Sequence, residues 1–307
     1  MDIIYYKSDI GNFGDDLNAW LLPKLLGNDM LNSSSDSCII GIGSILDENS
    51  RLMESTKKYK TKYIFGTGVR SINTNLQLDD SYKTLFLRGP FSSLKINKNI
   101  DSYISDGAYS LALTDFYEKK LKDSKKKYKV SFMPYFRSMD KVDWVKICKE
   151  MSWNLISPLE KNIEFLLSEI ASSELVVSEA MHGAIIADIC RVHWKRVRFY
   201  SHIHETEVVS EFKWNDWLYS VNLSNNYFNL RFLNTELFPK RILKKYFNSY
   251  FVSQQEKEIV KALKSSLLDK ETVMLSTDEV FFEIKKKIQI IIEDFKNNIN
   301  EGVSSIL

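Results

Sequence analysis

Short apolar runs of strand length alternate with segments of helical periodicity along the first 200 residues of this chain. Strands are predicted at residues 2–6, 38–40, 63–65, 85–87 and 104–106, and then at 130–135, 153–156, 175–177 and 197–200. Helices are predicted at 17–26, 141–151, 163–170 and from residue 182 onward. This alternation predicts an α/β protein built on parallel sheets with helices on both faces.

A lysine-rich stretch at residues 118–129 separates two such α/β parts. A solvated helix end followed by a linker is the usual structure of such a charge run, so we place the domain boundary there. The predicted domains are 1–120, 121–235 and a helical extension, 236–307. In that extension, Val280, Phe281, Ile284, Ile288, Ile291, Ile292 and Phe295 recur at three-to-four spacing. This face is predicted to pack on the protein body; binding to a membrane surface is the alternative.

Composition excludes several classes of protein. The formal net charge of +2 gives no argument for nucleic-acid binding, and no apolar run approaches the length of a membrane span. No signal peptide is visible at the start. Cys38, Cys148 and Cys190 are scattered in apolar surroundings, which is typical of reduced core residues. We therefore expect a cytoplasmic protein.

The candidate functional residues lie at the ends of predicted strands. Nine of the eleven glycines lie in the first 107 residues, mostly where a predicted strand ends. None forms a P-loop or a dinucleotide-binding fingerprint. His182 stands where a strand ends and a helix begins, the edge at which open α/β sheets bind ligands. It is a candidate catalytic residue, and a histidine that merely caps its helix is the alternative.

Taken together and in this order, the turns at the strand ends identify a protein family more specifically than any single turn does. They read Gly11-Asn-Phe-Gly-Asp-Asp-Leu-Asn18, the Gly-x-Gly corners, Arg88-Gly-Pro-x-Ser92, Ser105-Asp-Gly-Ala108 and Ser178-x-x-Met-His182-Gly183. Over roughly residues 1–200 the chain resembles the polysaccharide pyruvyl transferase family, in its bacterial exopolysaccharide branch. The resemblance implies two Rossmann-like domains facing a cleft, as in GT-B glycosyltransferases. It also implies transfer of pyruvate from phosphoenolpyruvate onto two hydroxyls of one sugar, giving a cyclic ketal. The glycan acceptor is often lipid-linked in this family, which keeps peripheral association with the inner face of the cytoplasmic membrane open.

This chemistry assigns roles to residue types. Protonation of the donor's C3 needs a general acid, for which we predict His182. Deprotonation of the sugar hydroxyl suits a carboxylate, and Asp15, Asp16 or Asp106 are candidates, although Asp15 or Asp16 also suits the N-terminus of the helix. On the acceptor side we predict contacts from Asn12, Asp106 and Gly68.

The anionic donor needs cationic partners and strand-end turns. We predict donor contacts from Arg88, Arg137, Ser178 and Gly183, with Arg70 as a further cation. Many family members have an arginine two residues before the histidine, where this chain has Ala180. We expect Arg137 to replace it, because the carboxyl ends of parallel strands meet at one edge of a sheet.

Other features favour structural roles. His202-Ile-His204 resembles a metal pair but lacks further ligands, so we expect a polar loop, no metal and no cofactor. Trp194, Trp214, Trp217 and Tyr219 suit either sugar stacking or a core, and we favour the core. Two rival functions stay open. They are a GT-B glycosyltransferase using a sugar nucleotide, and a non-catalytic carbohydrate-binding relative.

Overall fold

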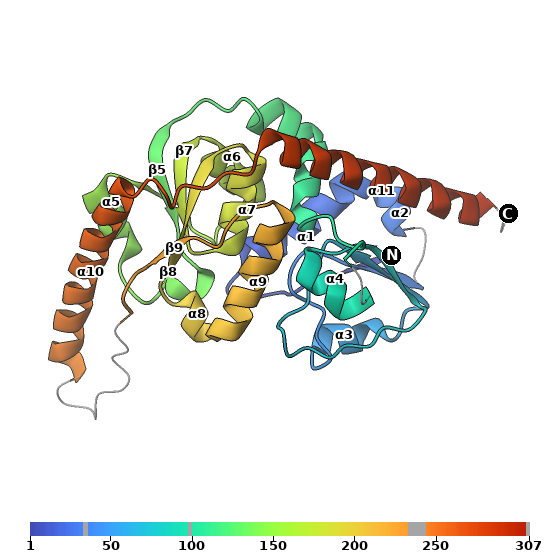
Figure 1. Ribbon diagram of the computed structural model, residues 1–307, viewed down its shortest axis with the longest axis horizontal. Helices are drawn as coiled ribbons and strands as arrows, with labels where there is room; N and C mark the ends of the chain where they lie inside the picture. Colours follow the sequence, from blue (N-terminus) through green and yellow to red (C-terminus); the bar gives the residue numbers. More distant parts are fainter. Residues whose placement is uncertain (33–35, 98–99, 233–243, 305–307) are drawn as a thin grey trace.

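The computed structural model describes residues 1–32, 36–97, 100–232 and 244–304, and it contains two parallel sheets (Figure 1). The first has the order β1–β2–β3–β4, formed by Asp2–Ile4, Ser37–Ile40, Thr61–Phe65 and Tyr82–Phe86. The second has the order β6–β5–β7–β8–β9, formed by Asn154–Leu155, Tyr128–Met133, Ser173–Ser178, His193–Arg198 and Tyr227–Asn229. Every pairing between these strands is parallel, so the predicted α/β class is confirmed.

Helices connect the strands within each half. Those before β5 are α1 (Phe13–Leu26), α2 (Asn28–Asn32), α3 (Arg51–Thr56), α4 (Pro90–Asn97), the 3₁₀ helix η1 (Gly107–Leu113) and the π-helix η2 (Tyr117–Leu121). Those from β5 onward are the 3₁₀ helix η3 (Phe136–Ser138), α5 (Trp144–Met151), α6 (Ile163–Ala171), α7 (Met181–Ile189), α8 (Ser201–His204), α9 (Glu207–Ser220), α10 (Lys244–Leu268) and α11 (Asp278–Ser304). Several begin at a side-chain cap; the Asp143 carboxylate, for example, accepts the Lys146 N–H and starts α5.

One predicted strand is wrong. Residues 104–106 form no strand, and an isolated parallel bridge joins Leu87 to Tyr103 just before them. The Asp106 carboxylate accepts the Ala108 N–H at 3.0 Å and turns the chain into η1. Two other strands are shorter than expected, since β1 ends at Ile4 and β6 has two residues. Residues 236–243 and 305–307 of the predicted extension lie outside the described residues.

The two halves share one hydrophobic core. Helix α1 packs against α6 and α7 of the second half, and buried side chains from both halves form one continuous cluster. The start of α1 is fixed directly, because the Phe13 N–H donates to the Pro158 carbonyl at 3.0 Å. Farther along the helix, Trp20 Nε1 donates to Glu164 Oε1 at 3.1 Å. The N-termini of α1 and α7 therefore lie in a fixed relation to each other. The domain bounds 1–120, 121–235 and 236–307 remain predictions.

The last helix crosses back from the second half to the first (Figure 1). Its apolar face packs on η1 and β3, and the Phe295 ring lies 4.8 Å from the Tyr63 ring, centroid to centroid. Phe281, Ile284, Ile288 and Ile292 are buried in the same cluster. The predicted packing of this amphipathic helix on the body is confirmed. Among the described residues, no helix combines the length and apolar character needed to cross a membrane.

The scattered cysteines and tryptophans also belong to the core. Cys38, Cys148 and Cys190 are buried and unpaired, as predicted. Trp194 and Trp217 are fully buried and stack on each other at 5.2 Å, which confirms the core interpretation for these two rings. Tyr219, by contrast, is exposed and contacts Phe91.

Candidate active site

A pocket of about 640 Å³ opens between the two halves. The first half contributes the start of α1, the loop after β2 and the start of α3. The second half contributes the loops that follow β5, β7 and β8, together with α9. The turns after parallel strands β5, β7 and β8 meet here because their carboxyl ends lie at one edge of the sheet.

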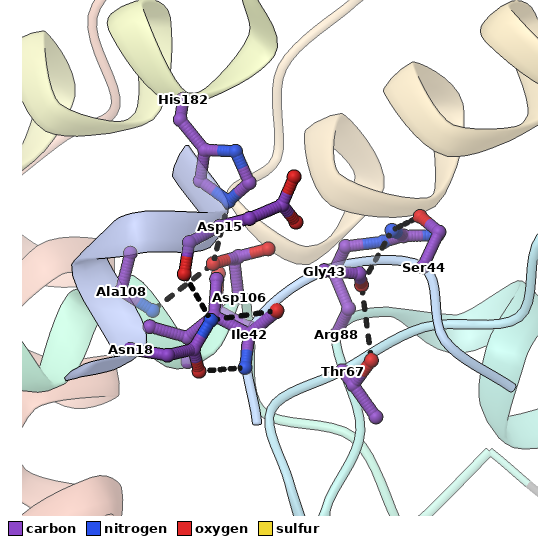
Figure 2. A network of polar contacts seen from close by, with 12 residues as sticks. Asp15, Asn18, Ile42, Gly43, Ser44, Thr67, Arg88, Asp106, Ala108 and His182 are labelled. Atoms are coloured by element: carbon purple, nitrogen blue, oxygen red, sulfur yellow. Dashed lines mark hydrogen bonds and ion pairs between the residues drawn. The ribbon is translucent and has the colours of Figure 1, made fainter. Parts of the chain in front are cut away.

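His182 lies at the first turn of α7 and faces the start of α1 (Figure 2). Its Nε2 atom is buried and lies 3.8 Å from Asp106 Oδ1, while the side chain as a whole keeps 13% of its exposure. Gly14 makes the approach possible, since a Cβ at that position would lie 2.0 Å from Nδ1 of the ring. A distance of 3.8 Å is too long for a hydrogen bond, and Nε2 has no hydrogen-bond partner among the described residues.

Asp106 is therefore not placed to bind an acceptor. It is fully buried outside the pocket lining, one oxygen accepts the Ala108 N–H, and the other has no hydrogen-bond partner among the described residues. It lies behind the imidazole, 3.8 Å from Nε2 of His182.

Asp15 and Asp16 are adjacent but face different surroundings. The Asp15 carboxyl lines the pocket and accepts a hydrogen bond from Asn12 Nδ2, which also lines the pocket. Asp16 Oδ2 instead accepts the Asn12 backbone N–H at 3.0 Å and lies outside the lining. The N-cap of α1 is Asn12, so the N-cap role foreseen for Asp15 or Asp16 is wrong. Asp16 instead closes the first turn from within the helix, whereas Asp15 faces the pocket.

Burial shifts the pKa of all three titratable groups at this point. Desolvation raises the pKa of Asp15 to about 7, against a smaller opposing effect of the Asn12 hydrogen bond. Desolvation also raises the pKa of Asp106 to about 6. The pKa of His182 falls to about 3, through burial first and then through the charges of Lys213 and Arg88. Near neutral pH the imidazole is unprotonated, and Asp15 holds a proton part of the time.

Arg137 lies in the same pocket, as the sequence predicted. It belongs to η3, directly after β5, and stacks over Phe136 with its guanidinium carbon 5.0 Å from the ring centroid. Its Nε atom is buried without a hydrogen-bond partner, and its guanidinium forms no ion pair with any residue the structure describes. Ala180, which stands where many family members have an arginine, also lines this pocket. Arg137 is therefore a cation available to an anionic ligand.

Arg88 and Gly68 are not where a ligand contact requires them. The Arg88 side chain is fully buried and forms an ion pair with Asp216 of α9, with Nε 2.9 Å from Oδ2. Its remaining N–H groups donate to Ser44 Oγ and to the carbonyls of Gly43 and Val69. A Cβ at Gly68 would lie 2.3 Å from this guanidinium, so the glycine makes room for it. The predicted donor contact of Arg88 and acceptor contact of Gly68 are corrected to structural roles that join the two halves.

Ser178 and Gly183 also support the site from outside its lining. Ser178 Oγ donates to the Ala180 carbonyl at 2.7 Å and shapes the turn before α7. A Cβ at Gly183 would lie 2.4 Å from that hydroxyl oxygen and 2.6 Å from Met133 Sδ. Their predicted donor contacts are replaced by close packing that fixes the start of α7.

Several lining residues were missed by the sequence analysis. Lys213 of α9 pairs with Glu205 at 2.6 Å, and Tyr135 Oη lies 3.2 Å from His204 Nδ1. Lys213 carries no local signal, because it lies inside a helix and not at a strand end. Glu179 was missed although it directly follows β7, where the strand-end argument applies. Within the described ranges, no three His, Cys, Asp or Glu side chains gather closely enough to hold a metal ion.

The fold and the pocket define an α/β protein with a pocket between its two halves, which holds an arginine and a histidine close to a carboxyl group where the N-termini of two helices meet. Residues 2–194 match the polysaccharide pyruvyl transferase family, and the chain belongs to it, as the sequence motifs predicted. A relative is the succinoglycan biosynthesis protein ExoV of Rhizobium meliloti (strain 1021), which is 32% identical over 221 residues. The aligned part is 72% of this chain and 65% of that relative, so the chain matches just under two thirds of its length.

Proposed function

We propose that this protein transfers pyruvate from phosphoenolpyruvate onto two hydroxyls of one sugar residue, in a polysaccharide or its lipid-linked precursor. The products are a cyclic pyruvate ketal and inorganic phosphate. Family membership and the name of the relative, a biosynthesis protein for the exopolysaccharide succinoglycan, support this class of reaction. The reaction would take place in the cytoplasm, where a lipid-linked acceptor at the membrane's inner face is accessible.

One observation carries the proposal. A single pocket brings together Arg137, His182 and Asp15, although Asp15 and His182 are 167 residues apart in the chain (182 − 15). Phosphoenolpyruvate carries a carboxylate and a phosphate, which need a planar cation such as a guanidinium. Its reaction also needs one group that gives a proton and one that takes a proton. We infer that the pocket is the cleft of a GT-B-like arrangement, with donor contacts mainly from the second half.

The proton chemistry suits an exchange of the roles predicted from the sequence. We assign proton donation to C3 of the enol to Asp15, because its raised pKa of about 7 keeps a proton available at neutral pH. Protonation leaves an oxocarbenium-like centre at C2. A sugar hydroxyl attacks C2, and Nδ1 of unprotonated His182 accepts the hydroxyl proton. The second hydroxyl then displaces phosphate, which departs with the remaining proton, and the ketal ring closes.

Arg137 would hold the donor through this sequence. Its free guanidinium suits bidentate contact with a carboxylate or a phosphate. This role is the one we expected for a replacement of the arginine absent at Ala180. Asn12 would contact the acceptor, since its amide lines the pocket beside Asp15.

The test is a donor assay with a panel of defined oligosaccharides. Purified protein is incubated with phosphoenolpyruvate and each sugar, and both phosphate release and product mass are measured. We expect phosphate release that depends on one sugar, with a mass gain of one pyruvate minus one water. Release of nucleotide from a sugar nucleotide instead would establish the glycosyltransferase alternative. If no sugar and neither donor reacts while the His182→Asn variant behaves identically, the protein is a non-catalytic relative.

A further inference from the structure

The Glu179 carboxylate accepts four hydrogen bonds at the wall of the pocket. It is 1% exposed and directly follows β7, three residues before His182. Oε2 accepts the Tyr135 N–H at 3.0 Å and the Ser138 hydroxyl at 2.6 Å. Oε1 accepts the N–H groups of Tyr200 and Ser201, each at 2.7 Å. Four donors from two other loops thus converge on one side chain.

These two loops supply most of the second half's pocket wall. The first follows β5 and carries Tyr135, Phe136 and Arg137; the second follows β8 and carries His204 and Glu205. Arg137 lies between the two residues of its loop that donate to Glu179. Among the described residues no ion pair restrains the guanidinium, so its position depends on the backbone of its turn and on its stacking over Phe136 of the same turn.

Glutamine cannot reproduce this arrangement. Its single carbonyl oxygen can accept the donors of one loop, but its NH₂ group then faces the N–H donors of the other. The N–H donors that face the NH₂ group lose their hydrogen bonds while they are buried, which is unfavourable. The loop that carries them is then no longer held against residue 179. The substitution would therefore displace the Arg137 guanidinium through its turn, without any contact between residue 179 and the ligand.

We propose that Glu179 is a positioning residue, which sets the Arg137 turn and the His204 turn for binding of the anionic donor. The identity of that donor, phosphoenolpyruvate, rests on the proposed function. Glu179 acts through Arg137, so the loss of both should cost little more than the loss of either one.

The kinetic test is a double-mutant cycle. Glu179→Gln should raise the KM for phosphoenolpyruvate at least about tenfold and change kcat less than about threefold. Arg137→Ala should raise KM at least about tenfold in the wild-type background, but less than about threefold in the Glu179→Gln background. Additive effects of the two substitutions, or an unchanged KM in Glu179→Gln, would overturn the proposal.

A matched control and a milder variant complete the design. Glu169→Gln alters another buried carboxylate of the same half, which accepts from Tyr128 and Asn154 outside the pocket, and should leave KM unchanged. Ser138→Ala removes one of the four donors and should raise KM in the same direction by a smaller factor. If Glu179→Gln does not fold, Ser138→Ala decides, and a KM equal to that of wild type overturns the proposal.

Hydrogen exchange separates this inference from the proposed function. In the absence of any ligand, Glu179→Gln should speed amide exchange in residues 135–138 and 200–204, and Glu169→Gln should not. If wild type fails to use phosphoenolpyruvate, the proposed function fails, and faster exchange at both turns still supports the positioning role. Unchanged exchange at both turns overturns that role.

Discussion

Substitution of Asp15 by Asn should make the protein more stable and less active. The Asp15 carboxyl is 9% exposed, lies at the pocket end of α1, and accepts a hydrogen bond from the Asn12 side chain. Burial makes the ionised form costly, which is why its pKa rises from 3.8 to about 7. An Asn side chain has nearly the same shape and can accept the same hydrogen bond, but it carries no charge at any pH.

The magnitude follows from linkage between proton binding and folding. A folded-state pKa above the unfolded value means that the native protein binds the proton more tightly. Stability contributed by the protonated carboxyl is thus fully present below about pH 4 and is lost as pH rises toward about 7. Three pKa units at about 1.4 kcal/mol each amount to about 4 kcal/mol. Asp15→Asn should therefore match wild type near pH 4, exceed its stability increasingly up to about pH 7, and keep a constant advantage above that.

The assay is urea unfolding of wild type and Asp15→Asn at several pH values between about 4 and 8. Asp16→Asn is the matched control, since it changes the neighbouring carboxyl outside the pocket and should not reproduce the pH-dependent gain. Turnover by Asp15→Asn should fall on the order of 100-fold, through loss of the proposed acid. A stability difference that does not change with pH would refute the reasoning about burial. Near-normal turnover would refute the catalytic role alone.

Four further outcomes are expected. His182→Asn should lower turnover on the order of 100-fold or more, with a smaller change in unfolding free energy than Arg88→Ala causes; near-normal turnover in a folded variant would contradict the assignment. Arg137→Ala should raise the donor KM at least about tenfold while acceptor KM stays nearly constant, and Arg137→Lys should recover part of the loss; donor binding like wild type in both variants would exclude the replacement of the missing arginine. Arg88→Ala should destabilise the protein by about 3–5 kcal/mol, because it leaves Asp216 buried without its partner, and chemical denaturation measures this. Activity should survive treatment with a chelator, and loss that one divalent cation restores would contradict metal-free catalysis.

The sequence predicted most of the strands and the helix that begins near His182. It also predicted that Arg137 lies at the same edge of the sheet as His182. These features depend on local patterns, namely apolar runs, glycine corners and residues directly after strands. The edge argument works for Arg137 because parallel strands bring distant loops together regardless of the loops' own sequence.

The failures concern partners that are far apart in the chain. Arg88 has the same strand-end position as Arg137, and its burial depends on Asp216, which follows 128 residues later. A single sequence gives no sign of that pairing. Gly68 was interpreted as a ligand contact for the same reason, since only the fold shows the guanidinium beside it. The exchange of roles between His182 and Asp15 depends on burial, which composition and spacing do not reveal.

The return of α11 to the first half makes that half discontinuous in sequence. Its side chains complete a core around Tyr63 and η1 that residues 1–120 alone leave open. A shortened protein that ends just before α11, at residue 277, should therefore be insoluble. Co-expression of the missing helix as a separate peptide should restore solubility by complementation. Helix α11 thus lies outside the residues that match the family, yet its side chains fill part of the core of the half in which that match begins.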